Sequence, residues 1–348
     1  MINNYWMSPE TTSVNRLPML NIEHFEQISL DGTWRFQLLH KPTEKLGKRW
    51  ASIPVPGLWT MQETSDVFFD KPIYTNVQMP FPEQPPFVPE ENPTGVYERD
   101  FDLPKSWSGK RIVLQLGGYE SVALIYINGA EVGLTKDSRL AAEFDITQFV
   151  RSGNNVVRID VTKWSDATFI EDQDQWWHGG ITRSVKLYAT NKVFIEKFAA
   201  TAGLEKDLAT GTLDVRAQIS SIDNEPTDGY SLHMSIRELS KQKSSVLSHT
   251  LKTFVAPIWT ETPVEVALAA RDYFHAKFWN GNLPKSAQQA VSIMEPPAQG
   301  LVALSTKVAK IKAWSAEEPN LYTLDIELRN PEGAVIEVSQ QRIGFRSI

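Results

Sequence analysis

A long series of short β-strands, with no amphipathic helix between them, constrains the fold of this chain more than any other feature. Its clearest member is a hairpin in which Ala123–Ile127 and Glu131–Leu134 flank Asn128-Gly129. Asn-Gly is the strongest two-residue turn signal, because both residues tolerate a positive φ. Similar runs recur at roughly ten-residue intervals, at 97–103, 111–116, 143–146 and 156–161. This spacing predicts an antiparallel sandwich of the jelly-roll type.

A second series of strands follows and predicts a second sandwich, immunoglobulin-like and without a cysteine pair. Its members are 192–199, 211–219, 230–236, 245–251, 264–268, 303–308, 322–328 and 334–338. We therefore expect an all-β chain with two domains, residues 1–190 with an N-terminal arm over 1–26, and residues 191–348. An aromatic-rich segment at 272–299 interrupts the second series. It is expected to be an insertion, either a surface flap or a contact pad for something outside this chain.

The composition of the chain excludes several kinds of partner and functional site. The 348 residues carry a net charge of −7 without a basic stripe, which argues against nucleic acid as a partner. The chain has no cysteine, so disulfides, thiolate metal sites and a cysteine nucleophile are excluded, and its six histidines show no zinc-ligand spacing. No apolar run is long enough to span a membrane, and the first ten residues do not resemble a signal peptide. Together these features predict a cytoplasmic protein.

The segment Trp164–His178 has the most unusual composition, with four acids and three tryptophans in fifteen residues. Carboxylates accept hydrogen bonds from sugar hydroxyls, and an indole covers the apolar face of a sugar ring. A sugar contact is therefore one interpretation of this acidic loop. The other is a tryptophan-rich core plug carried on a solvated acidic loop.

A proline-rich segment over residues 72–93 has seven prolines, which exclude a helix or a central strand and predict a stiff, extended loop. Within it lies the short β-prone stretch Ile73–Val77, which contains Asn76. A rigid loop that carries an aromatic and an amide can bind a ligand at a low entropic cost. A purely structural wrap over the domain is the alternative.

The acids of the acidic loop do not form an obvious catalytic pair. Asp172 and Asp174 are two residues apart, whereas the two carboxyl groups of a glycosidase flank the scissile bond and normally come from separate elements. Contacts to a ground-state sugar or to a hard cation fit these acids better than catalysis.

Several motifs resemble the N-terminal part of the bacterial β-galactosidases of glycoside hydrolase family 2. In the first half these are Ile73-Tyr-Thr-Asn-Val77, Pro86-Phe-Val-Pro89, Asp137-Ser-Arg139 and Glu171-Asp-Gln-Asp174. In the second half they are Ala313-Trp-Ser-Ala-Glu-Glu-Pro-Asn-Leu-Tyr322 and Arg342-Ile-Gly-Phe-Arg346. The resemblance covers nearly the whole chain apart from the segment 272–299. It implies a sugar-binding jelly roll followed by an immunoglobulin-like domain.

The resemblance also implies functional residues. Asn76 matches the family's asparagine that reaches the galactoside, and Asp174 matches its aspartate that contacts both the galactose and a sodium ion. The catalytic TIM barrel and its two glutamates are expected beyond Ile348, as are the ligands of a magnesium ion. The implied partners are a lactose-like β-galactoside, the barrel and C-terminal domains, and further copies of the full-length protein. Residues Gln175–Gly180 depart from the family pattern and put the subsite preference in question.

Three functional hypotheses follow. The first is the N-terminal part of a retaining β-galactosidase, inactive alone, in which the other acids and the tryptophans of the acidic loop serve as a scaffold for Asp174. The second is a self-sufficient galactoside-binding module. The third is part of another enzyme of the family, such as a β-glucuronidase or a β-mannosidase.

Overall fold

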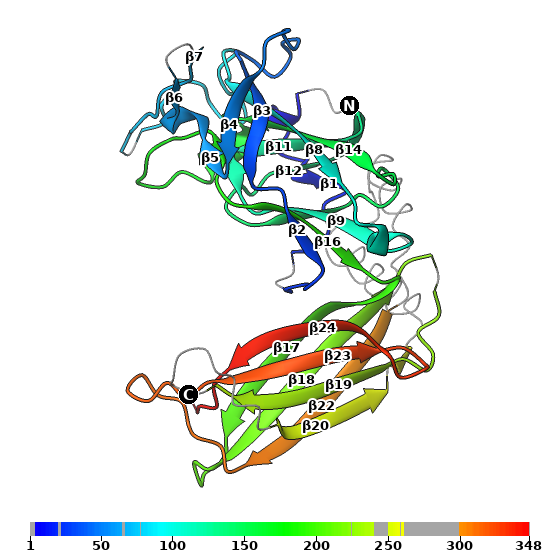
Figure 1. Cartoon of the computed structure of the whole chain (residues 1–348). Helices are drawn as coiled ribbons and strands as arrows, with labels where there is room; N and C mark the ends of the chain where they lie inside the picture. Colours follow the sequence, from blue (N-terminus) through cyan, green and yellow to red (C-terminus); the bar gives the residue numbers. More distant parts are fainter. Residues whose placement is uncertain are drawn as a thin grey trace, which may run out of the picture. The chain divides into compact units, whose positions relative to one another are not determined.

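The computed structural model describes residues 4–19, 22–64, 67–76, 78–223, 225–239, 250–257, 259–260 and 299–347. The chain forms two compact units (Figure 1). The first unit comprises Met1–Met19 with Glu26–Ala189, and the second comprises Leu20–Phe25 with Thr190–Ile348. All elements of the described residues are β-strands or short 3-10 helices. The predicted all-β fold with two successive sandwiches is confirmed.

The first unit is built around a seven-stranded antiparallel sheet. In spatial order its strands are β1 (Ser13–Val14), β12 (Ala130–Thr135), β11 (Val122–Ile127), β14 (Asn154–Thr162), β8 (Thr94–Asp102), β3 (Gly32–Leu39) and β4 (Ala51–Val55). A four-stranded sheet contains β13 (Ala142–Asp145), β9 (Arg111–Leu116), β16 (Val185–Thr190) and β2 (Gln27–Ser29). Smaller sheets join β10 (Tyr119–Glu120), β15 (Gly180–Ile181) and β5 (Gly57–Leu58), and β6 (Glu63–Thr64) with β7 (Val67–Phe68). Four 3-10 helices complete the unit, η1 (Tyr5–Met7), η2 (Trp59–Met61), η3 (Lys105–Trp107) and η4 (Asp166–Phe169).

The core of the first unit follows from the strand patterns. Side chains of a strand alternate between its two faces, so that alternate apolar residues of the sheets converge on one cluster. Trp34, Phe36, Leu114 and Phe144 belong to this cluster and are at most 1 % exposed. The predicted hairpin is present: β11 pairs with β12, and Asn128 and Gly129 have φ values of 51° and 82°. Positive φ at both positions suits a tight hairpin turn.

The N-terminal segment packs along the outer side of this unit. Tyr5 is buried in a small cluster with Val122 and Leu134, and β1 pairs with β12. Residues 20–25 belong to the second unit. There, the His24 ring nitrogen Nδ1 lies 3.0 Å from Glu337 Oε1. The predicted arm over residues 1–26 therefore divides between the two units.

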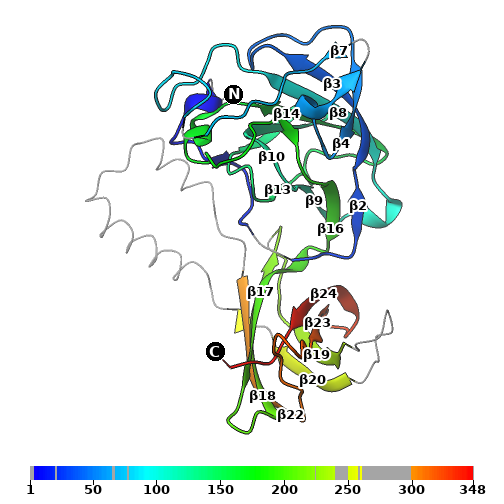
Figure 2. The same cartoon turned by 90° about the vertical axis from the view of Figure 1, so that its left-hand side faces the viewer.

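The second unit is a sandwich of two four-stranded antiparallel sheets (Figure 2). One sheet contains β17 (Val193–Leu204), β18 (Thr210–Ser221), β22 (Gln299–Ala309) and β21 (Trp259–Thr260). The other contains β20 (Thr250–Pro257), β19 (Ser231–Glu238), β23 (Tyr322–Arg329) and β24 (Val335–Ile343). Ile219, Met234, Leu324 and Phe345 form part of the core between them. The predicted strand 264–268, most of the predicted strand 245–251 and nearly all of the expected insertion 272–299 lie outside the described residues.

Among the described residues, no helix has the length and apolar character needed to cross a membrane.

Candidate functional site

The proline-rich loop and the acidic loop leave the first unit side by side because of the sheet register. β8 and β14 are antiparallel neighbours, and Thr94 at the start of β8 pairs with Thr162 at the end of β14. The loop before β8 and the loop after β14 therefore emerge at the same edge of the sheet. The buried side chain of Asn92 joins them, since it donates to the Trp164 carbonyl at 2.8 Å and accepts from the Trp164 amide at 2.9 Å.

Farther out, the two loops pair a second time through an isolated antiparallel bridge. Ile73 and Trp177 exchange both backbone hydrogen bonds, with N···O distances of 3.2 and 2.7 Å. The Trp177 indole also donates to the Thr75 hydroxyl at 2.8 Å. The indole is 5 % exposed, so that one anchored side chain fixes the register between segments a hundred residues apart.

Beside this bridge the two paired segments, a short ribbon, carry four exposed side chains: Tyr74 and Asn76 from the proline-rich loop, and Asp174 and Trp176 from the acidic loop. The rings of Tyr74 and Trp176 pack against each other, with centroids 5.5 Å apart and an interplanar angle of 40°. The backbone turns at Asp174, where the Gln175 amide donates to the Gln173 carbonyl at 2.6 Å. We call these four residues the rim cluster.

A tyrosine hydroxyl connects the two residues that the sequence singled out. Tyr74 Oη donates to Asp174 Oδ1 at 2.8 Å, and the Asn76 side chain lies near the same hydroxyl. The hydrogen bond to the Asp174 carboxylate is the main reason that the pKa of Tyr74 is raised above its ordinary value, and the nearby Asn76 amide acts in the opposite direction. Asp174 is exposed, and among the described residues its Oδ2 accepts no hydrogen bond.

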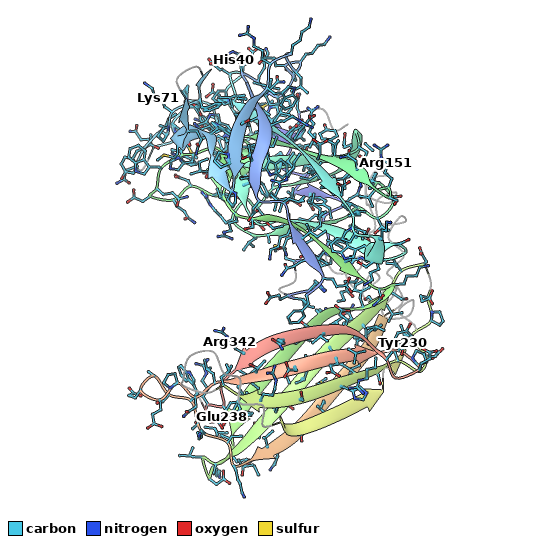
Figure 3. The ribbon with its side chains drawn as sticks, viewed as in Figure 1. His40, Lys71, Arg151, Tyr230, Glu238 and Arg342 are labelled. Atoms are coloured by element: carbon cyan, nitrogen blue, oxygen red, sulfur yellow. The ribbon has the colours of Figure 1, made fainter. Side chains whose placement is uncertain are left out.

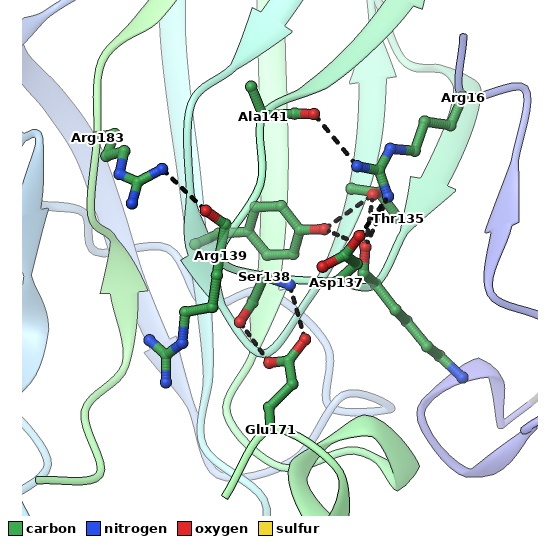
Figure 4. A network of polar contacts seen from close by, with 10 residues as sticks. Arg16, Thr135, Asp137, Ser138, Arg139, Ala141, Glu171 and Arg183 are labelled. Carbon is green, nitrogen blue, oxygen red and sulfur yellow. Dashed lines mark hydrogen bonds and ion pairs between the residues drawn. The ribbon is translucent and has the colours of Figure 1, made fainter. Parts of the chain in front are cut away.

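Two other acids of the acidic loop are bound to the sandwich rather than to solvent. Asp166 forms an ion pair with Lys136 at 2.5 Å, and both side chains are nearly buried. Glu171 accepts hydrogen bonds from the amide and the hydroxyl of Ser138 (Figure 4). Their contacts match the expected role of a scaffold for Asp174.

The three tryptophans of the loop differ in exposure. Trp164 and Trp177 are each 5 % exposed, whereas Trp176 is 53 % exposed and packs on Tyr74 at the surface. The role of the tryptophans as a scaffold for Asp174 stays a prediction.

An aromatic cluster lies beneath the two loops. The rings of Trp164 and Trp177 meet edge to face at 5.6 Å, and Phe81 from the proline-rich loop packs on Trp164 at 5.3 Å. Val88 is buried in the same cluster. The proline-rich loop thus contributes apolar side chains to a small core of its own, which holds the rim cluster in place.

A buried polar layer borders the aromatic cluster. The Lys163 amine is fully buried, pairs with Asp70, and lies 4.9 Å from the centroid of the Trp164 ring. It also donates to the backbone carbonyl of Lys71 at 3.3 Å. Lys71 lies at the periphery of the first unit (Figure 3). Burial lowers the pKa of Lys163, and Asp70 opposes that shift by stabilising the charged amine.

His178 is part of this polar layer and is neutral at pH 7. Its Nδ1 lies 2.8 Å from the hydroxyl of Thr60. Burial lowers the pKa of His178 below the ordinary 6.5, and the positive charges of Lys163 and Arg139 lower it further.

The rim cluster has the groups needed to hold a neutral sugar. A carboxylate oxygen accepts hydroxyl hydrogen bonds, an amide both donates and accepts, and exposed rings cover C–H groups. A sodium ion also suits the Asp174 carboxylate, because hard cations prefer oxygen ligands. No group of three or more acidic or histidine side chains within the described residues could hold a metal ion.

The sequence singled out Asn76 and Asp174, and the structure brings them together. It did not single out Tyr74 or Trp176 as individual site residues. The signal that could have found them is the spacing: Tyr74 precedes Asn76 by two residues, and Trp176 follows Asp174 by two. In extended segments that interval puts each aromatic on the same face as its polar neighbour.

A jelly-roll sandwich with a carboxylate, an amide and two exposed rings at its rim has the features of a carbohydrate-binding domain. Comparison with known families agrees with this class. Residues 27–191 match the sugar binding domain of glycosyl hydrolases family 2, and residues 193–346 match a second model of glycosyl hydrolases family 2. The chain belongs to glycosyl hydrolase family 2.

Curated relatives include two β-galactosidases. The enzyme of Priestia megaterium is 32% identical over an alignment of 333 positions, which covers 92% of this chain and 28% of the relative. That of Kluyveromyces lactis is 33% identical over an alignment of 353 positions, which covers 98% of this chain and 32% of the relative. The chain therefore spans about 30% of the length of such relatives.

Solved structures share the fold at lower identity. A putative β-galactosidase from Bacteroides fragilis has a TM-score of 0.63 at 16% identity, covering 92% of this chain and 41% of that one. A Bacteroides uniformis β-glucuronidase has a TM-score of 0.59 at 19% identity, covering 92% and 32%. At these identities the likeness establishes the fold.

Proposed function

We propose that this chain is the N-terminal part of a retaining β-galactosidase and that it supplies accessory contacts to a catalytic barrel. In this proposal Asn76 and Asp174 contact the terminal galactose, and Asp174 is also one ligand of a sodium ion. The chain alone is inactive. The observation that carries the proposal is the pairing of Asn76 and Asp174 through the Tyr74 hydroxyl on one exposed face. The β-galactosidase relatives, at 32% and 33% identity, support the substrate.

The charge of the rim cluster favours a neutral sugar over a glucuronide. Asp174 is the only acidic or basic residue of the four, and the neighbouring Asp172 is also an exposed acid. A glucuronide carries its own carboxylate, and like charges a few ångströms apart repel each other. The β-glucuronidase alternative, which rests on the solved structures of that name, requires a cation near the sugar carboxylate. A nitrophenyl glucuronide is therefore expected to be a far poorer substrate than the galactoside.

The test compares the 348-residue chain with the complete protein that contains the barrel, using a nitrophenyl β-galactoside. The chain alone should show no hydrolysis above background. In the complete protein, Asp174→Asn should lower kcat/KM at least about tenfold, because a charge-assisted contact to the galactose is lost. It should also weaken activation by sodium.

The matched control is Asp172→Asn, which removes an exposed acid from the same loop. It should change kcat/KM less than about twofold, because a solvated charge contributes little. Hydrolysis by the 348-residue chain at a rate near that of the complete protein would contradict the proposal, as would equal effects of the two asparagine substitutions.

A further inference from the structure

Trp176 and Tyr74 form an exposed pair of rings that the proposed galactose and sodium contacts do not use. Trp176 is 53 % exposed and Tyr74 is 48 % exposed, although their ring centroids lie only 5.5 Å apart. Tyr74 belongs to the proline-rich loop and Trp176 to the acidic loop. Their relative position is therefore fixed by the backbone bridge between Ile73 and Trp177.

The surroundings of this pair distinguish it from other exposed apolar side chains. Isolated exposed apolar residues are common and need no explanation. Phe87 is 61 % exposed and has no ring partner among the described residues. Trp176, in contrast, lies two residues from Asp174, and the hydroxyl of its partner Tyr74 donates to Asp174 and lies near the Asn76 side chain. Rings beside a carboxylate and an amide match both the apolar and the polar surface of a sugar.

We propose that Trp176, buttressed by Tyr74, is a stacking platform for the apolar face of a β-galactopyranoside, and thereby a specificity-determining residue. The inference rests on the proposed function and adds to it the residue that distinguishes sugars. In galactose the axial 4-hydroxyl leaves the hydrogens of C3, C4 and C5 together on one face. In glucose the equatorial 4-hydroxyl moves the C4 hydrogen to the other face. A flat indole therefore covers more apolar surface of galactose than of glucose.

The polar groups adjoin the platform. Tyr74, whose ring packs on Trp176, donates to Asp174, so the platform lies next to the carboxylate that is proposed to accept the sugar hydroxyls. The platform lies entirely within this chain, and weak binding is expected without the barrel.

The experiment is saturation-transfer NMR on the 348-residue chain with methyl β-D-galactopyranoside as the probe. Transfer should be strongest at H3, H4 and H5, which face the indole. Trp176→Ala should raise the dissociation constant about 3- to 10-fold, as expected for one lost ring contact. Trp176→Phe should restore part of the affinity. Methyl β-D-glucopyranoside should give weaker transfer than the galactoside.

Phe87→Ala is the control, because it removes another exposed ring and should leave the transfer unchanged. The platform is refuted if the unmodified chain shows no transfer, if Trp176→Ala binds as well as the unmodified chain, or if both sugars bind alike. Any of them leaves the proposed function standing as long as Asp174→Asn impairs the complete enzyme, so the two failures are distinguishable.

Discussion

Replacing Trp177 by alanine should separate the integrity of the rim cluster from the stability of the fold. The indole is 5 % exposed, packs edge to face on Trp164 at 5.6 Å, and donates to Thr75 at 2.8 Å. Removing a buried tryptophan ring destabilises a protein by about 3–5 kcal/mol. Because Trp177 belongs to a small cluster under loops, which can relax around a cavity, we expect the lower end, about 3 kcal/mol.

The expected loss is measurable as a thermal shift. For a unit of this size, about 3 kcal/mol corresponds to a decrease of about 10 °C in the Tm of its unfolding transition. Trp177→Phe keeps most of the apolar contact and removes only the hydrogen bond to Thr75, so it should destabilise by about 1 kcal/mol. Calorimetry of the three proteins gives both values.

Trp107→Ala provides a matched control, because Trp107 is 6 % exposed and packs into the main core of the same unit. Both alanine variants should lose comparable stability. Only Trp177→Ala should also lose hydrogen-exchange protection at the amides of Ile73 and Trp177, which pair across the two loops. Equal protection of these amides in the two variants would refute the idea that Trp177 fixes the ribbon, as would a destabilisation by Trp177→Ala well under 1 kcal/mol.

Three further predictions follow from single contacts. Asp174→Asn should lower the pKa of Tyr74 toward its ordinary value, because the carboxylate that holds the hydroxyl proton is gone; NMR of ring-labelled tyrosine measures it, and an unchanged titration would contradict the contact. The pKa of His178 in the folded protein is lower than the 6.5 of the unfolded chain. Below pH 6.5 the unfolded chain therefore binds the proton more readily than the folded protein does, so the stability that is present above pH 6.5 is lost as the pH falls. His178→Asn should therefore flatten the fall in Tm between pH 7 and pH 5, and an identical slope in the two proteins would rule this contribution out. Gly179→Ala should destabilise the first unit by about 1–3 kcal/mol, because an added Cβ would lie 2.1 Å from the Trp59 ring; an unchanged Tm would show that the ring moves aside freely.

Much of the fold was predictable because strand formation leaves a local signature. The 111–116 strand has the bounds of β9, and the Asn128-Gly129 turn lies where the hairpin predicts it. Alternation of apolar residues indicates which side chains face a core, whatever the rest of the chain does. The assignment of residues 20–25 to the second unit has no such signature, because contacts such as that of His24 with Glu337 join residues far apart in the sequence.

In the candidate site, too, some features follow from the local sequence and others depend on contacts between distant segments. The sequence by itself determined that Tyr74 lies two residues from Asn76 and that Trp176 lies two residues from Asp174. Only the tertiary structure decided that these two pairs come together. That depends on the register between segments a hundred residues apart, which the pairing of β8 with β14 and the buried Trp177 set together. A local period cannot specify such a register, because sliding one segment by a single residue preserves every local preference and turns Asp174 away from Asn76.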